Sequence, residues 1–263
     1  MDLIVWPYQA APGARNMALD EAAMHGAGRG EHLLRFYGWT PPCLSLGRNQ
    51  PTPDRARGPA RTPLVLGDDI VRRPTGGRAV YHGPELTYAL AVPERFLGGP
   101  RRIYTATHAA LGTALRALGV EPDRGAAVAG GEGTALDSRG CFAAPAPGEI
   151  SAGGRKLVGS AQWRHGGAIL QHGSLLLRND QHRAGDDDAA GRRAVGLAEL
   201  VSPLPELDTL MTAITCALAD AYSDALAAPK RFVTAPARPG ADVLERAAAL
   251  ERKYRSPEWT WRR

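Results

Sequence analysis

Hydrophobic positions recur along this chain with two spacings, and each spacing predicts one kind of element. Apolar residues that return every three or four positions predict a helix. Four segments have this spacing or are rich in helix-forming residues: Asn16–His25, Arg101–Leu118, Leu207–Ala227 and Asp242–Tyr254. The second of these is followed by Gly119, a residue type that commonly ends helices.

Short apolar or alternating runs bounded by turn-forming residues predict strands. Six segments have this pattern: His32–Trp39, Pro42–Leu46, Leu86–Val92, Glu149–Ser151, Arg155–Trp163 and Ala168–Leu177. Gly153–Gly154 has the composition of a two-residue hairpin turn, and a second turn is expected at His165–Gly167. Because strands come in hairpins and helices in separate blocks, we expect an α+β fold with a mixed or antiparallel sheet flanked by helices.

Three stretches are expected to be loops because they are polar or rich in Gly and Pro. They are Gln50–Pro63, Ala126–Gly140 and Asn179–Arg193. The last contains the acidic run Asp186–Asp188, which is interpreted as a solvated surface rather than a metal site.

Composition narrows the class of protein. The chain is 44% hydrophobic and 22% charged, as is typical of soluble globular proteins. It has no apolar run of the roughly 20 residues needed to span a bilayer. The N-terminal residues lack the basic leader and apolar stretch of a secretory signal. We therefore expect a cytoplasmic protein with no membrane association.

The chain is basic, with a formal net charge of +5 and a pI near 9.4. A basic surface can serve nucleic acid, but it can equally serve docking of acidic proteins. No aromatic-interleaved basic stripe or nucleic-acid-binding motif is present, so nucleic acid is not expected as a partner.

The three cysteines, Cys43, Cys141 and Cys216, are an odd number at wide spacings. This spacing fits neither a disulfide framework nor a zinc ribbon. Each is by default a small buried side chain, so a reactive cysteine must be argued from its neighbours.

The densest candidate segment is R-R-P-T-G-G-R-A-V-Y-H-G, residues 72–83. Adjacent glycines allow the backbone to bend tightly and approach a ligand closely. Their amides, together with three nearby arginines, would suit an anion, a phosphate or a polarised carbonyl. The alternative is an ordinary glycine turn on a basic surface. The segment is not a P-loop, because G-x-x-x-x-G-K-[ST] is absent.

A second candidate combines Cys141 with Lys156. Cys141 ends a glycine-rich loop, where burial is less expected than for Cys43 or Cys216. Nearby positive charge favours the nucleophilic thiolate. Lys156 lies between a glycine turn and Gly159, where it can point along a groove, although most lysines are solvated surface charges.

The third candidate is L-Q-H-G-S-L, residues 170–175. A His-Gly pair inside an apolar strand suggests close approach of another backbone. His172 is a candidate general base, and a hydrogen-bonded core histidine is an equal alternative. Metal binding is not expected: His165 and His172 would lie on opposite faces of a shared strand, with no carboxylate cluster nearby.

Together the three segments resemble the biotin/lipoate protein ligase superfamily: R-R-P-T-G-G-R-A-V-Y-H, then G-x-K-L-V-G-S-A-Q, then L-Q-H-G-S-L. The similarity runs from about Asn16 to Leu177, with a weaker match at Lys253–Tyr254 and Glu258–Trp259. The chain is most similar to the cysteine-dependent octanoyltransferases of lipoate assembly. The resemblance implies one catalytic domain over residues 1–263, related to class II aminoacyl-tRNA synthetases, with a helical C-terminal extension.

The resemblance also implies a mechanism. Cys141 would take octanoyl from acyl carrier protein, and a lysine of the glycine-cleavage H protein or another lipoyl domain would then displace it. Lys156 is the matching motif lysine. The residues implied to bind substrate are Arg73, Thr75, Gly76, Gly77, Arg78, His82, Gly159, Ser160, Ala161, His172 and Gly173. No cofactor or metal is expected, and the protein is expected to be a monomer.

Three alternatives remain open. A lipoate-protein ligase shares the fold but uses ATP and magnesium to activate free lipoate. Against it, such ligases usually have a third glycine where Arg78 stands, and many have a C-terminal accessory domain that the helical tail after Leu177 does not match. An amidotransferase between lipoyl-bearing proteins would use the same cysteine. A non-catalytic module that binds an acylated carrier would need neither Cys141 nor Lys156.

Overall fold

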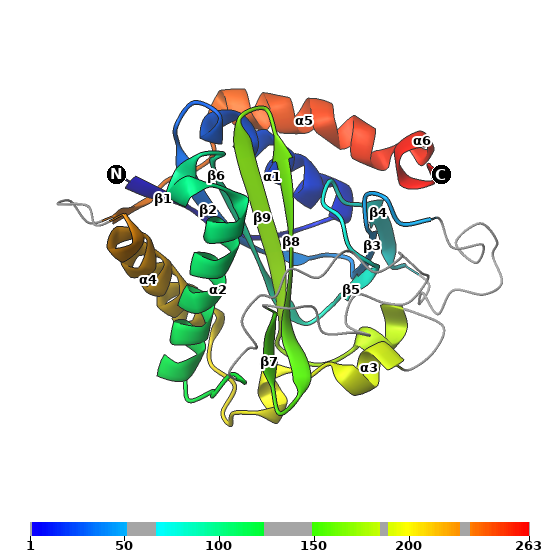
Figure 1. Cartoon of the computed structure of the whole chain (residues 1–263). Coiled ribbons are helices and arrows are strands. Elements are labelled where there is room, and N and C mark those ends of the chain that lie inside the picture. The colour runs from blue at the N-terminus through cyan, green and yellow to red at the C-terminus, as the bar shows by residue number, and fades with distance from the viewer. Residues whose placement is uncertain (1, 52–66, 124–148, 185–188, 227–231, 263) are drawn as a thin grey trace.

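The structure is a computed structural model that describes residues 2–51, 67–123, 149–184, 189–226 and 232–262 (Figure 1). Its main sheet has seven strands in the order β10-β1-β2-β6-β9-β8-β7. Their bounds are β1 Asp2–Ala11, β2 His32–Trp39, β6 Glu85–Pro93, β7 Ile150–Ala152, β8 Arg155–His165, β9 Ala168–Leu176 and β10 Val233–Pro236. β1 pairs in parallel with β2 and β10, and the other neighbours pair antiparallel. The sheet is therefore mixed, as predicted.

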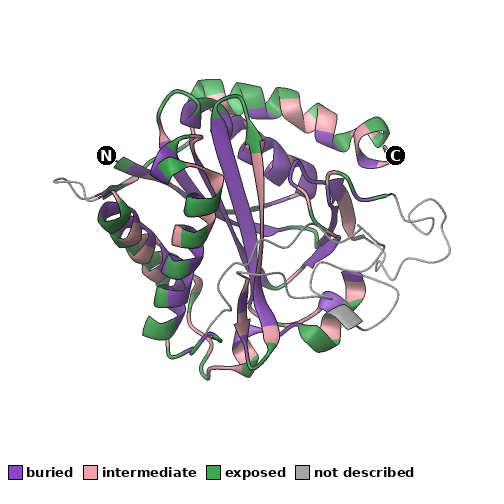
Figure 2. Cartoon of the chain, in the orientation of Figure 1, coloured by how far each residue is buried: buried purple, intermediate pink, exposed green. Residues whose placement is uncertain are grey.

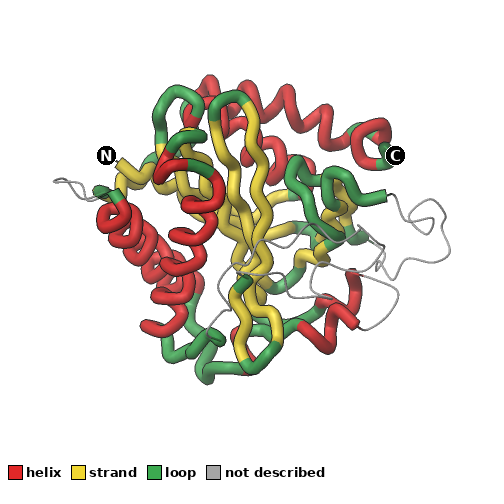
Figure 3. The backbone as a smooth tube through the Cα atoms, in the orientation of Figure 1, coloured by secondary structure: helices red, strands yellow, loops and turns green. Residues whose placement is uncertain are grey.

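Two pairs of helices cover the two faces of this sheet. Helices α1 (Gly13–Ala27) and α5 (Ala241–Arg255) contact each other on one face, and α2 (Pro100–Ala117) and α4 (Leu207–Ala225) do so on the other. Figure 3 shows the strands between these helical layers. The α+β fold expected from the sequence is confirmed.

Successive side chains of a strand point to opposite faces of the sheet, so apolar strand residues give each helical layer a surface to pack against. On β2, Leu34 packs in the cluster beneath α2 and α4, whereas Leu33 packs in the cluster beneath α1. On β6, Leu90 and Ala91 divide in the same way. The central strands are consequently buried on both sides (Figure 2).

A second, three-stranded sheet lies beside the main one and carries the first motif. It has the order β4-β3-β5, with bounds Asp69–Arg72, Cys43–Leu46 and Val80–His82. The first motif therefore ends β4, crosses residues 73–79 as a connection we call the motif loop, and continues into β5. Sequence reading found the turn but not the two short strands that flank it.

The remaining elements are short. They are the helices α3 (Ala189–Arg193) and α6 (Pro257–Thr260) and the 3₁₀ turns Phe96–Gly98, Gln181–Ala184 and Leu197–Glu199. The stretch expected to be a loop at 179–193 thus contains a 3₁₀ turn and a helix. None of the helices in the described ranges is long and apolar enough to cross a membrane.

The hairpin turns agree with the sequence prediction. Gly153 and Gly154 both have positive φ, at 58° and 72°, and join β7 to β8. Gly166 and Gly167, at 58° and 75°, join β8 to β9. Consecutive positive φ values are what a tight hairpin requires and what glycine adopts most easily. β8 extends to His165, two residues beyond the predicted end at Trp163.

Strand β1 was not predicted. It contains Pro7 and a register irregularity between Trp6 and Gln9, and residues 7–10 are exposed. A proline and a bulge interrupt the alternation that marks a strand in sequence. Its parallel partners β2 and β10 are contributed by distant segments, so no local hairpin indicated the pairing either.

The cysteines differ in their surroundings. Cys43 is buried in β3, as expected. Cys216 is exposed on α4, so its expected burial was wrong; the apolar face of that helix instead contributes Leu210, Ile214 and Leu218. Cys141, the loop Ala126–Gly140 and the run Asp186–Asp188 lie outside the described residues.

Candidate active site

The three motifs meet around one cavity of about 380 Å³. Every residue that the resemblance implied as substrate-binding lines it, except Thr75. Those residues are Arg73, Gly76, Gly77, Arg78, His82, Gly159, Ser160, Ala161, His172 and Gly173. The motif loop forms one wall, and the paired strands β8 and β9 form another. Segments far apart in the chain are therefore brought to one site.

An apolar wall of the cavity was missed by sequence reading, apart from Val80 of the first motif. It is formed by Met17 of α1, Tyr37 and Trp39 of β2, and Val80 of β5. Trp39 is held by hydrogen bonds from its indole nitrogen to Glu85 (3.0 Å) and Thr87 (2.8 Å), and it stacks on His82 at 3.9 Å. In the sequence these residues are indistinguishable from core side chains. The wall suits an apolar ligand segment.

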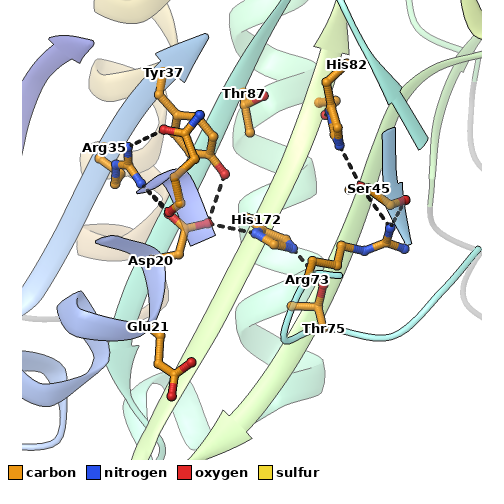
Figure 4. A network of polar contacts seen from close by, with 12 residues as sticks. Asp20, Glu21, Arg35, Tyr37, Ser45, Arg73, Thr75, His82, Thr87 and His172 are labelled. Atoms are coloured by element: carbon orange, nitrogen blue, oxygen red, sulfur yellow. Dashed lines mark hydrogen bonds and ion pairs between the residues drawn. The ribbon is translucent and has the colours of Figure 1, made fainter. Parts of the chain in front are cut away.

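Asp20, from the middle of α1, is the centre of a buried polar network (Figure 4). Its carboxylate accepts a hydrogen bond from Arg35 at 2.7 Å, one from the Tyr37 hydroxyl at 2.9 Å and one from Nδ1 of His172 at 2.9 Å. Asp20 is fully buried and Arg35 nearly so. Sequence reading missed Asp20, because an acidic residue in a helical pattern normally indicates a solvated position.

His172 links this network to the motif loop. Its Nε2 lies 2.6 Å from the Thr75 hydroxyl, so Thr75 holds a residue of the cavity wall although it does not line the cavity itself. Burial lowers the pKa of His172, against the opposing effect of Asp20. The neutral ring donates from Nδ1 to Asp20 and accepts from Thr75 at Nε2. His172 is thus a hydrogen-bonded histidine that also faces the cavity.

A second buried network runs parallel to the first. His82 Nδ1 lies 2.8 Å from Glu85, and its Nε2 lies 2.7 Å from the Ser45 hydroxyl. The same Glu85 oxygen also accepts from Ser174 at 2.8 Å and from Thr87. The other carboxylate oxygen of Glu85 is buried and has no hydrogen-bond partner within the described part of the chain. His82 is therefore positioned by both of its ring nitrogens.

The side chains of Arg72 and Arg73 donate hydrogen bonds to backbone carbonyl groups. Arg73 donates to the carbonyls of Ser45 (3.1 Å), Gly76 (2.8 Å) and Arg78 (2.7 Å), which shapes the motif loop from within. Arg72 is fully buried and donates to carbonyls at 2.6 to 2.9 Å, those of Gly47, Gln50 and Thr260. The sequence suggested that these arginines surround an anion. In the structure both arginines donate to carbonyls, because the irregular loop leaves carbonyls that no strand satisfies, and Arg73 also lines the cavity.

Lys156 is buried rather than solvated, with 2% of its surface exposed. Its ammonium group donates to Glu149 at 2.5 Å, and Glu149 lines the cavity. Two charged groups with so little exposed surface are stable in the interior only when each has a partner of opposite charge. The ordinary surface alternative for Lys156 is thus wrong. Cys141, eight residues before Glu149, is outside the described part of the chain.

Burial raises the pKa of the Cys43 thiol well above its usual range. That cysteine therefore stays a thiol, which is a poor nucleophile. Among the described residues, no group of three or more His, Cys, Asp or Glu side chains could hold a metal ion.

Comparisons with known proteins identify the family. The lipoyl protein ligase A/B catalytic-domain family matches residues 12–195. Octanoyltransferase LipM of Exiguobacterium sibiricum is 35% identical, and that of Kyrpidia tusciae 37%, each over 95% of this chain and 95% of its own. The protein therefore belongs to the lipoyl protein ligase A/B catalytic-domain family.

Solved structures share the fold at lower identity. A lipoate-protein ligase A bound with ATP has a TM-score of 0.76 at 20% identity, covering 99% of this chain and 98% of its own. A bipartite lipoate protein ligase from Thermoplasma acidophilum has a TM-score of 0.69 at 19% identity, covering 99% and 96%. Both ligases therefore share the fold of this protein over nearly its whole length.

Removing the Asp20 carboxylate should destabilise the fold strongly. Asp20→Ala leaves Arg35 buried without its charged partner, so we expect the free energy of unfolding to fall by about 3–5 kcal/mol. Urea denaturation of both proteins measures the difference. Glu31→Ala is the control, because its exposed pair with Arg29 should contribute less than about 1 kcal/mol. Equal losses in the two variants would contradict the role of Asp20.

The buried His172 should make stability depend on pH. Its pKa is lowered, so above about pH 6.5 both the folded and the unfolded state are neutral there. As pH falls below that value, the unfolded state binds the proton first and stability decreases. The melting temperature should therefore fall less steeply with acid in His172→Gln than in the wild type. His25→Gln, at an exposed position, is the control and should follow the wild type.

Proposed function

We propose that this protein transfers an octanoyl group from a carrier-protein thioester to a lysine of a lipoyl-type domain, through an acyl-cysteine on Cys141. The observation that carries the proposal is the meeting of all three motifs around one cavity that has an apolar wall and, in Glu149, a charged residue at its side. The octanoyltransferase relatives, similar over nearly their whole length, support the same reaction class. The acceptor class is supported by the T. acidophilum ligase, which was solved as part of a system with its E2 lipoyl domain.

The proposed reaction has two steps, acylation of Cys141 and transfer of the acyl group to the acceptor lysine. The Cys141 thiolate attacks the donor carbonyl, a new C–S bond forms, and the carrier thiolate leaves. The amine of the acceptor lysine then attacks the acyl-cysteine, loses its proton as the amide forms, and releases the Cys141 thiolate. Exchange between thioesters is nearly isoenergetic and amide formation is downhill, so no ATP is required.

Lys156 is the proposed oxyanion stabiliser. Its ammonium group is buried beside the cavity-lining Glu149, and a fixed charge in a buried site acts more strongly than one in water. Glu149 holds the ammonium group in place at 2.5 Å. A charge that is already positioned needs little reorganisation when negative charge develops on the carbonyl oxygen.

Ligase activity is the second candidate, because one protein with a similar fold is a lipoate-protein ligase bound with ATP. Arg78 at the position of a third motif glycine favours the transferase. Intact-protein mass spectrometry separates the two. Octanoyl carrier protein without ATP should give a hydroxylamine-sensitive octanoyl adduct on Cys141. Acylation of a target domain only with ATP and free acid would establish the ligase and leave Cys141 without a catalytic role.

Replacing Cys141 tests the covalent step. Cys141→Ser should abolish turnover and the adduct, since a hydroxyl is a far weaker nucleophile than a thiolate. Cys43→Ala and Cys216→Ser are the matched controls and should keep most activity, because one thiol is buried and protonated and the other lies on α4. Turnover by Cys141→Ser near the wild-type rate would refute the acyl-cysteine.

Replacing Lys156 tests the oxyanion role. Lys156→Ala should lower the single-turnover rate of acyl-enzyme formation by about 100-fold, as for loss of one oxyanion donor, with little change in donor KM. Arg155→Ala removes a neighbouring exposed charge and should leave the rate unchanged. Circular dichroism and thermal melting check that the variants are folded. A rise in KM alone would mean that Lys156 binds the donor rather than stabilising the transition state.

A further inference from the structure

Cationic and aromatic side chains gather beside the motif loop. The guanidinium of Arg48 lies 5.1 Å from the ring centre of Trp163 and 5.9 Å from that of Trp259. Over the same Trp259 ring lie Arg262 at 3.8 Å and Lys253 at 4.3 Å. We call these five residues the rim cluster. Three of them are cations that share one indole, an arrangement that the proposed chemistry does not use.

The rim cluster is joined to the cavity wall through Thr75. The amide of Arg48 donates to the Thr75 carbonyl at 2.8 Å, and the Thr75 hydroxyl bonds His172, which lines the cavity. Trp163 follows the cavity residue Gln162 on β8. On the motif loop the cluster is thus bonded to Thr75, which precedes the cavity residue Gly76. On β8, Trp163 lies two residues from the cavity residue Ala161, on the same face of the strand.

The cations of the cluster lie within each other's electrostatic field. Burial first, and then the charge of Arg48, lower the pKa of Arg262. Lys253 is paired with Glu21 at 2.6 Å, whereas Arg262 donates to the carbonyl of Arg48 at 2.6 Å. Neighbouring like charges favour binding of an anion. The guanidinium of Arg48 has five N–H donors in one plane, a geometry suited to a phosphate, and one of its nitrogens makes a long contact of 3.5 Å with the Pro74 carbonyl.

We propose that the rim cluster binds the phosphodiester of a phosphopantetheine arm, with Arg48 as its principal ligand. This inference rests on the proposed function, because the donor thioester is then at the end of such an arm. The arm has an anion at one end, a neutral amide-containing middle and the thioester at the other end. The cationic cluster beside the motif loop and the apolar wall of the cavity match the order of those groups. The rings of Trp163 and Trp259 attract the cations and so help to hold them together at this place.

Binding of the arm without its acyl group tests the site independently of catalysis. Isothermal titration calorimetry compares phosphopantetheine with pantetheine, which lacks only the phosphate. We expect the wild type to bind phosphopantetheine about tenfold more tightly, the effect of one charge-assisted contact, and Arg48→Ala to bind both equally. Arg116→Ala, which removes an exposed charge on α2, is the matched control and should retain the preference.

Acyl transfer from three donors then identifies the source of the phosphate. Arg48→Ala should raise KM about tenfold for octanoyl carrier protein and octanoyl coenzyme A and leave octanoyl pantetheine unchanged. An equal rise for all three donors would make Arg48 a support of the motif loop and overturn the proposal. A rise for the carrier protein alone would place the contact on the protein surface instead, which also overturns it.

If the proposed function is wrong, the same experiments give a different set of results. Acylation of Cys141 would then be absent with every donor, while the calorimetric preference for phosphopantetheine still decides whether the rim cluster binds the phosphate. Thermal melting establishes that Arg48→Ala is folded. Arg48→Lys keeps the charge and should recover part of the preference for the phosphate. Equal binding of phosphopantetheine and pantetheine by the wild type would refute the site.

Discussion

The carboxylate of Asp20 is the constraint on which the rest of the site depends. A fully buried charge is unfavourable unless its oxygens are satisfied, and here Arg35, Tyr37 and His172 satisfy them together. These partners lie on β2 and β9, so the requirement positions α1 over the sheet. Through His172 the same requirement reaches Thr75 and the motif loop. One ionic group in the core thus determines where a wall of the cavity lies.

The motif loop follows a related rule. Its irregular backbone leaves carbonyl oxygens that no neighbouring strand can satisfy, and buried carbonyls need donors. A guanidinium has five N–H donors in a rigid plane, so one arginine can join several carbonyls. Arg73 joins two carbonyls of the loop to the carbonyl of Ser45 on β3, and Arg72 joins the loop's base to Thr260 near the C-terminus. The paired arginines of the motif therefore hold the loop that forms one wall of the cavity.

Local patterns in the sequence predicted the elements that depend on local chemistry. The two glycine hairpins, β2 and the main helices follow from turn residues and periodicity. Strand β1 was missed because Pro7 and a bulge break its alternation and its partners are distant in sequence. The resemblance located the cavity-lining motifs, but not the apolar wall of Met17, Tyr37 and Trp39. Burial of Asp20 and Lys156 also could not be predicted, because it depends on neighbours that only the fold supplies.

The motif L-Q-H-G-S-L shows how the two hydrogen-bond networks are kept in register. Alternation along β9 places His172 and Ser174 on the same face, where one meets Asp20 and the other meets Glu85. Gly173 between them has no room for a side chain, because a Cβ there would lie 2.5 Å from the Ser160 hydroxyl and 2.7 Å from the Tyr88 ring. The glycine lets the other face of β9 approach these groups closely. The spacing of the motif is therefore a geometric requirement of the cavity wall.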